Sequence, residues 1–120
     1  MNLEFIQELW DKDSVIDNEL LHSESTRVPA LHAKYYKIYN NILTLKKAQE
    51  TRYKVLKKEK WQYYTGKASP EVYAEKPFDF KVIKSDLGIY FDGDEDLIKC
   101  IAKIDYYQIM LDYLESILKV

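Results

Sequence analysis

The sequence has few of the residues that interrupt or cross-link a fold. Its 120 residues include three glycines, three prolines and one cysteine. This composition favours long regular elements over many short strands and turns. The lone Cys100 cannot form an internal disulfide, which is typical of a reducing compartment. We expect it to be a buried structural thiol.

Signals for membrane insertion, secretion and common catalysis are also missing. No apolar run is long enough to span a bilayer and no charged-then-apolar leader is present, so we expect no membrane association and a cytoplasmic setting. The motifs GxxxxGK[ST], GxGxxG, GxSxG and HExxH do not occur, so we do not expect an enzyme.

Metal ligands at recognisable spacing are absent as well. His22 and His32 have no cysteine or carboxylate at zinc-ligand spacing. The DGDED stretch at 92–96 lacks the spaced ligands of a calcium loop. We therefore expect neither a metal ion nor any other cofactor.

The sequence does contain enough apolar material for a packed interior. Hydrophobic residues make up 47% of the chain and aromatic residues 14%. Together with the length, this predicts one folded domain over residues 1–120. The net charge is only −2, so only the distribution of charge can indicate a nucleic-acid partner.

The first part of the chain has helical periodicity with an expected interruption. In residues 2–13 the apolar Leu3, Ile6, Leu9 and Trp10 have helical spacing, with acidic residues between them, which predicts a short amphipathic helix. Asp17 can cap a second helix. Pro29 predicts a break or kink in that helix.

A long helix is predicted in the middle of the chain. From Leu31 the apolar residues step by four and three, as in a coiled-coil seam, and no glycine or proline follows before Gly66. Gly66 suits the C-terminal cap, so the helix should end near Thr65. The predicted seam consists of Leu31, Tyr35, Ile38, Ile42 and Leu45.

Residues 67–93 predict an irregular connector, because they hold two of the prolines and two of the glycines. Alternation at Phe78, Phe80 and Val82 fits a short extended segment. A brief helix through Leu87 fits these signals equally well, so both interpretations stay open.

A last helix is predicted from Asp92 or Asp94 to the chain end, with Glu95 and Asp96 in its first turn. Its apolar residues form two stripes, one for packing and one left for self-association. We therefore predict an all-α fold in which the long helix and the C-terminal helix form an antiparallel hairpin. We also predict a short N-terminal helix, an irregular connector and assembly into a helical oligomer. The stripes are Leu97, Ile101, Ile104, Leu111, Leu114 and Leu118, and Tyr106, Ile109, Met110, Tyr113 and Ile117.

Charge is segregated along the chain. Residues 46–67 contain eight of the 18 basic residues and two acidic ones, whereas the first 27 residues contain seven acidic and two basic ones. At roughly 100° per residue, six lysines of this block fall within an arc of about 160°, together with Tyr53, Trp61 and Tyr64. We expect this cationic, aromatic side to face solvent and the side with Leu45, Ala48, Val55, Leu56 and Tyr63 to be buried. The six lysines are Lys46, Lys47, Lys54, Lys57, Lys58 and Lys60.

Cations with interleaved rings are what single-stranded nucleic acid requires, because cations neutralise phosphates and rings stack on bases. The alternative is that the lysines only solvate one helix face and the rings fill a subunit interface.

The segment 58–67, KEKWQYYTGK, resembles the basic-aromatic motif K-x-[RK]-[LW]-x-Y-Y-[ST]-G-[KR] of the UvsY family of phage recombination mediators. Further similarity to this family occurs at 28–36 (VPALHAKYY), 76–79 (KPFD) and 94–99 (DEDLIK). The resemblance covers essentially the whole chain.

The resemblance implies an accessory protein that binds single-stranded DNA and contacts the phage's RecA-like recombinase and its single-strand-binding protein. Such a protein promotes replacement of the single-strand-binding protein by the recombinase in the cytoplasm of the infected bacterium. Lys58 and Lys60 match motif positions associated with DNA contact, whereas Lys57 stands where the motif often has leucine. Family members are ring-like homo-oligomers of six or seven subunits, and they usually continue past the position of Val120 into another helical segment that supports assembly.

Two functional hypotheses follow. In the first, a recombination mediator binds single-stranded DNA: lysines neutralise phosphates while aromatic residues stack on bases or orient the lysines. In the second, the chain is a structural coiled-coil adaptor that does not bind DNA. The candidate binding residues are Lys46, Lys47, Lys54, Lys57, Lys58, Lys60, Trp61, Tyr63, Tyr64 and Lys67.

Overall fold

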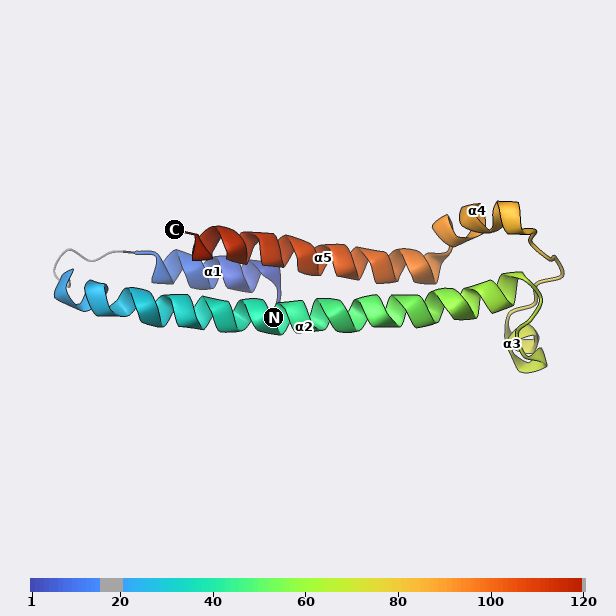
Figure 1. Cartoon of the computed structure of the whole chain (residues 1–120), viewed down its shortest axis with the longest axis horizontal. Helices are drawn as coiled ribbons and strands as arrows, with labels where there is room; N and C mark the ends of the chain where they lie inside the picture. Colours follow the sequence, from blue (N-terminus) through green and yellow to red (C-terminus); the bar gives the residue numbers. More distant parts are fainter. Residues whose placement is uncertain (16–20, 120) are drawn as a thin grey trace. The chain divides into compact units, whose positions relative to one another are not determined.

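The computed structural model describes residues 1–15 and 21–119, without the side chains of 21–28. All regular elements in these ranges are helical, which confirms the predicted all-α class (Figure 1). The predicted cap at Asp17 lies outside the described residues. The helices are α1 (Leu3–Asp13), α2 (Leu21–Tyr64), α3 (Pro70–Glu75), the 3-10 helix η2 (Lys84–Asp86), α4 (Leu87–Asp92) and α5 (Glu95–Leu118).

The chain forms two compact units that share the two long helices. Unit 1 comprises residues 1–46 and 106–120, and unit 2 comprises residues 47–105. Helices α2 and α5 each contribute a part to both units.

Unit 1 is built on an apolar core between α1, α2 and α5. Ile6, Tyr35 and Leu114 are all fully buried. The ring of Trp10 meets that of Tyr35 edge-on, with centroids 5.2 Å apart. The core consists of Ile6, Tyr35, Ile38, Ile42, Met110, Leu111, Leu114 and Ile117.

Polar contacts tie α1 to both long helices within unit 1. The Tyr35 hydroxyl donates to the Asp13 carboxylate at 2.9 Å. The Leu3 amide donates to the Tyr106 hydroxyl at 2.9 Å. At the start of α1, the Asn2 side chain accepts from the Phe5 amide at 2.8 Å and caps the helix.

The predicted antiparallel hairpin is confirmed in each unit, because residues later in the sequence of α2 contact residues earlier in the sequence of α5. In unit 1, Tyr39 contacts Glu115 and Lys46 contacts Gln108. In unit 2, Gln49 contacts Cys100 and Lys60 contacts Asp96.

Helix α2 ends where the sequence predicts. Gly66 has a φ of +78°, a left-handed conformation that favours glycine. The Lys67 amide donates to the Gln62 carbonyl at 2.8 Å and the Gly66 amide donates to the Tyr63 carbonyl at 3.4 Å. These two hydrogen bonds form a Schellman motif, which satisfies carbonyls at the helix end.

For the connector between Gly66 and α5 the sequence left an extended segment or a brief helix open, and the structure has short helices there and no strand. Residues 76–83 contain no helix, and the Val82 amide donates to the Tyr64 carbonyl at 3.0 Å. Helix α4 follows and buries Leu87.

Three predictions about the helices are wrong. The predicted break near Pro29 does not occur, and helix α2 continues through this residue, because a proline removes one backbone hydrogen bond of a helix but leaves the others in place. Leu45 is 48% exposed, although it continues the predicted seam. The two stripes of α5 are not separate, since both contribute buried residues such as Leu97 and Met110, and both contribute exposed ones such as Ile101 and Ile109.

Candidate nucleic-acid interface

The part of α2 in unit 2 has an inner side that packs and an outer side that is open. Gln49, Tyr53, Leu56, Lys60 and Tyr64 are half-buried, and they recur every three or four residues. They therefore form one continuous helix face, directed toward the rest of unit 2.

On the outer side, Lys47, Lys54 and Lys58 are exposed and lie on one stripe, with the exposed ring of Trp61 one turn further on. We call these four residues the lysine ridge. Among the described residues, no carboxylate lies at ion-pair distance from these three lysines. The ridge is thus a row of three cations that form no ion pair with a described carboxylate, ending in an accessible ring.

Two further lysines of the basic block are exposed and lie over rings. The Lys57 Nζ is 5.5 Å from the ring centroid of Phe91 and 5.8 Å from that of Tyr53. The Lys67 Nζ is 4.4 Å from the ring centroid of Trp61. Cation–π contact favours one position for each ammonium group while it stays accessible to solvent.

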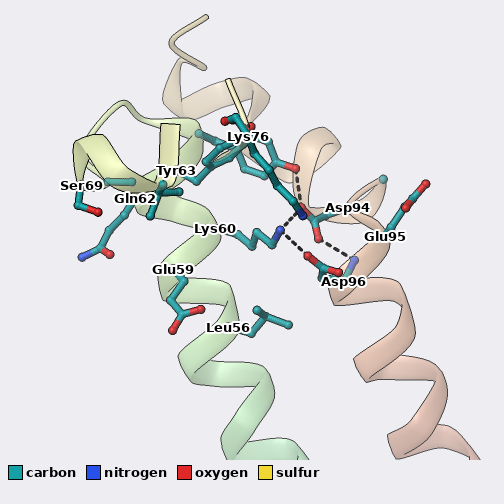
Figure 2. Close-up of a pocket in the computed structure, with 14 residues that line it drawn as sticks. Leu56, Glu59, Lys60, Gln62, Tyr63, Ser69, Lys76, Asp94, Glu95 and Asp96 are labelled. Carbon is teal, nitrogen blue, oxygen red and sulfur yellow. Dashed lines mark hydrogen bonds and ion pairs between the residues drawn. The ribbon is translucent and has the colours of Figure 1, made fainter. Parts of the chain in front are cut away.

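Lys60 differs from the ridge lysines because it is held by carboxylates. Its Nζ lies 2.7 Å from Asp96 and 3.4 Å from Asp94 (Figure 2). The Tyr64 hydroxyl also donates to Asp94, at 2.5 Å. We call Lys60, Tyr64, Asp94 and Asp96 the latch, since they join the end of α2 to the start of α5.

Asp94 also determines where α5 begins. Its side chain accepts from the amides of Asp96 and Leu97, both at 3.0 Å, which is the hydrogen bonding of an N-cap. This confirms one of the two predicted caps. Asp94 is only 6% exposed, and its charge is compensated by amides, a hydroxyl and an ammonium group.

The latch shifts the pKa values of Lys60, Asp96 and Tyr64 in a consistent way. Burial alone would lower the pKa of Lys60, but the hydrogen bond to Asp96 and the charge of Asp94 outweigh it, so the pKa is raised. The same hydrogen bond lowers the pKa of Asp96. Burial and the hydrogen bond to Asp94 raise the pKa of Tyr64. All three shifts favour the charge states that the latch requires.

Tyr63 and Tyr64 belong to an internal aromatic cluster. The Tyr63 ring is stacked on Tyr73, with centroids 5.5 Å apart, and lies 5.2 Å from the Phe78 ring. Tyr64 packs edge-on against Phe78 at 5.4 Å. The Tyr64 ring also contacts the rings of Tyr90 and Phe91. Both tyrosines therefore pack against other rings of unit 2.

A pocket of about 790 Å³ lies beside the latch (Figure 2). Lys60, Asp94 and Asp96 line one part of it, and Ser69 and Lys76 line another. Its lining carries both signs of charge, unlike the ridge.

The structure divides the ten predicted binding residues into two groups. Lys47, Lys54, Lys57, Lys58, Trp61 and Lys67 are exposed, as predicted. Lys46, Lys60, Tyr63 and Tyr64 are half-buried, and Lys46 donates to Gln108 at 2.6 Å in unit 1.

The predicted division of α2 into an open and a buried side is therefore partly wrong. Lys46, Tyr53, Lys60 and Tyr64 were placed on the open side but lie on the packed one, whereas Val55 is 55% exposed. Lysine and tyrosine bury their apolar stems and rings while their polar ends find partners, so charge alone does not reveal the open side.

Sequence reasoning missed that Asp94 and Asp96 are partners of Lys60. A signal was available, because the three-and-four spacing of the seam continues beyond Ile42 through Gln49, Leu56 and Lys60. Following the spacing rather than the apolar residues alone would have placed Lys60 on the inner side.

Within residues 1–15 and 21–119, no three histidine, cysteine or acidic side chains are grouped so as to hold a metal ion. No described helix is both long and apolar enough to cross a membrane.

Comparison with known proteins relates the whole chain to one family. The family model described as recombination, repair and ssDNA binding protein UvsY matches residues 9–120. The recombination protein uvsY of Enterobacteria phage T4 is 26% identical over 118 residues, which span 98% of this chain and 83% of that protein.

Two crystal structures of the bacteriophage T4 recombination mediator protein UvsY have similar folds. One superimposes with a TM-score of 0.87 at 24% identity, covering 99% of this chain and 86% of that one. The other gives a TM-score of 0.84 at 26% identity, with coverage of 99% and 84%.

Proposed function

Because the chain belongs to the UvsY family of recombination, repair and single-stranded-DNA-binding proteins, we propose that it acts as a recombination mediator. In this role it binds single-stranded DNA and helps to load a RecA-like recombinase in place of a single-strand-binding protein. The role is non-catalytic and is carried out in the cytoplasm of the infected host. The related phage T4 protein, which is called a recombination mediator, supports the assignment.

The lysine ridge is the observation that carries this proposal. Lys47, Lys54 and Lys58 offer three cations along one side of α2, and their neutralisation of phosphates would release counterions. Trp61 continues the stripe with a ring that is 38% exposed and on which an unstacked base can lie. Lys57 and Lys67 flank the ridge and add to its positive potential.

The other predicted contacts have an indirect role in this proposal. Lys60 and Tyr64 fix the start of α5 through Asp94 and Asp96, and Tyr63 supports the end of α2 through its stacked rings. Lys46 contributes through its hydrogen bond in unit 1. These residues hold the ridge in place.

Mediation follows from changing the conformation of the bound strand. A homo-oligomer, a hexamer or heptamer if the family pattern holds, repeats the ridge and so strengthens weak single sites through effective concentration. A strand held on such a surface favours whichever partner binds that conformation more tightly. We propose that this partner is the recombinase and that the single-strand-binding protein is displaced.

The experiment is a titration of fluorescently labelled oligothymidine, followed by a loading assay. We expect saturable binding by the natural chain and a shorter lag in recombinase assembly on strands coated with single-strand-binding protein. A variant carrying Lys47→Gln, Lys54→Gln and Lys58→Gln should weaken both effects. Absence of saturable binding by the natural chain would instead favour a structural adaptor.

A further inference from the structure

A second group of cations surrounds a recess between α2 and α5 in unit 2. The recess has a volume of about 410 Å³. Arg52 of α2 and Lys99 and Lys103 of α5 line it. Lys99 and Lys103 are four residues apart, so they lie one turn apart on the same face of α5. All three side chains are exposed.

The positive charge of this recess is compensated only in part by its own lining, which has three cations and one carboxylate. Asp96 is the carboxylate that borders it, and this group is bound by Lys60 at 2.7 Å. Among the described residues, Arg52, Lys99 and Lys103 take part in no ion pair. Three like charges around one hollow repel each other, and an anion bound between them would relieve this repulsion.

The recess lies on a different side of α2 from the lysine ridge. Arg52 precedes Lys54 by two residues, which places it about 160° away around the helix axis. A phosphate bound at Arg52 is therefore not one bound at the ridge. A strand that reaches both sites must pass around the helix.

We propose that this recess is a second phosphate-binding site for the single-stranded DNA that the ridge binds, an inference that rests on the function proposed above. The planar Arg52 guanidinium binds two oxygens of a phosphate, and the ammonium groups of Lys99 and Lys103 bind the same or the next phosphate. The family to which the chain belongs is described as single-stranded-DNA-binding, which favours a phosphodiester strand over an acidic protein segment as the anion.

The test compares two triple variants that remove equal charge. The recess variant carries Arg52→Gln, Lys99→Gln and Lys103→Gln. The control carries Lys37→Gln, Lys84→Gln and Lys119→Gln at exposed positions outside both sites. On long oligothymidine, we expect the recess variant to reduce the slope of log affinity against log salt by about 0.7 to 1.4, since the recess binds one or two phosphates and each neutralised phosphate on a single strand contributes about 0.7. The control should keep the natural slope.

Oligothymidine length supplies a second comparison. A strand too short to pass around α2 can occupy only one of the two sites at a time, so the recess variant should lose less affinity for it than for a long strand. An unchanged slope on long strands, with the ridge variant still defective, would refute the second site and leave the proposed function intact. Loss of saturable binding in the natural chain would refute the proposed function itself.

A footprint on the natural chain keeps the test independent of variant folding. Long oligothymidine should protect Lys99 and Lys103 from amine acylation, as measured by mass spectrometry, and should leave Lys37 reactive. Protection by polyglutamate but not by oligothymidine would overturn the proposal and assign the recess to an acidic protein segment.

Discussion

The two units are built from the same pair of long helices, but they use their helix contacts differently. In unit 1 the contact is mainly apolar, with eight buried side chains in one core beside the polar pairs Tyr39–Glu115 and Lys46–Gln108. In unit 2 the contact contains Gln49 with Cys100 and Lys60 with Asp96. Six basic and nine acidic residues give unit 1 a net charge of −3, whereas 12 basic and 11 acidic residues give unit 2 a net charge of +1.

This difference indicates that the two units have different roles. An apolar seam supplies stability, because burial of apolar area is the main favourable term in folding. A polar seam costs desolvation of its charged groups, so its presence in unit 2 needs another reason. We infer that the latch of unit 2 positions the lysine ridge, and that unit 1 mainly stabilises the two helices. Two tryptophans, Trp10 in unit 1 and Trp61 in unit 2, allow each unit to be followed separately by fluorescence.

The largest effect on stability is expected from the core of unit 1. Leu114 is fully buried, so Leu114→Ala should lower the free energy of unfolding by about 2–5 kcal/mol through lost burial and the remaining cavity. Urea denaturation of a Trp61→Phe background, in which Trp10 reports on unit 1, measures this loss. The matched change Leu45→Ala, at a 48% exposed position, should cost about 0.5 kcal/mol or less. Equal effects of the two changes would contradict the placement of the core.

Replacing Lys60 should affect unit 2 more than replacing its neighbour on the ridge. Lys60→Ala leaves Asp94 and Asp96 without their cation and should cost about 1–3 kcal/mol. Lys58→Ala removes an exposed lysine and should cost about 0.5 kcal/mol or less. Trp61 fluorescence in a Trp10→Phe background provides the measurement. Similar losses for the two variants would refute the latch.

Two glycines of unit 2 should respond in opposite directions to alanine. Gly66→Ala forces a side chain into a left-handed conformation and should cost about 1–2 kcal/mol. Gly88 lies in α4 with no neighbouring atom within 4 Å of the position of an added Cβ, so Gly88→Ala should leave stability unchanged or raise it by up to about 1 kcal/mol. Thermal unfolding compares them, and an unchanged stability of Gly66→Ala would contradict the helix end at Gly66.

The smallest effects concern pH and are confined to unit 2. Because the pKa of Asp96 is lowered, its contribution to the stability of the folded state is present above its ordinary pKa of 3.8 and is lost as the pH falls below that value. Because the pKa of Tyr64 is raised, its contribution to the stability of the folded state is present below pH 10.0 and is lost as the pH rises toward its folded-state pKa. Asp96→Asn should reduce the loss of stability at acid pH, and Tyr64→Phe should reduce the loss of stability at alkaline pH. Both are measured from unfolding curves followed by Trp61 fluorescence. Unchanged pH profiles would exclude these ionisations from the latch.

Local signals were sufficient to predict most of the fold. The end of α2 at Gly66 and the cap at Asp94 follow from residue types that suit those backbone positions, and the structure confirms both. The burial of Cys100 is also confirmed, since its exposed fraction is 4%. Pro29 misled the prediction because a single missing hydrogen bond does not end a helix whose other contacts persist.

The candidate site could be predicted only in part. The six exposed residues of the basic block lie where the charge pattern indicated. The position of Lys60 could not be predicted from charge, because its partners Asp94 and Asp96 lie more than 30 residues away and only the folded chain brings them together. Tyr63 and Tyr64 resembled base-stacking residues for the same reason, since their ring partners belong to the connector.

The most direct test of the central claim is the salt dependence of oligothymidine binding by the ridge variant. Lys47→Gln, Lys54→Gln and Lys58→Gln together should reduce the slope of log affinity against log salt by about 2, because three phosphate contacts are lost. The control that removes Lys37, Lys84 and Lys119 should keep the natural slope. A ridge variant with the natural slope would show that α2 does not carry the strand along its open side.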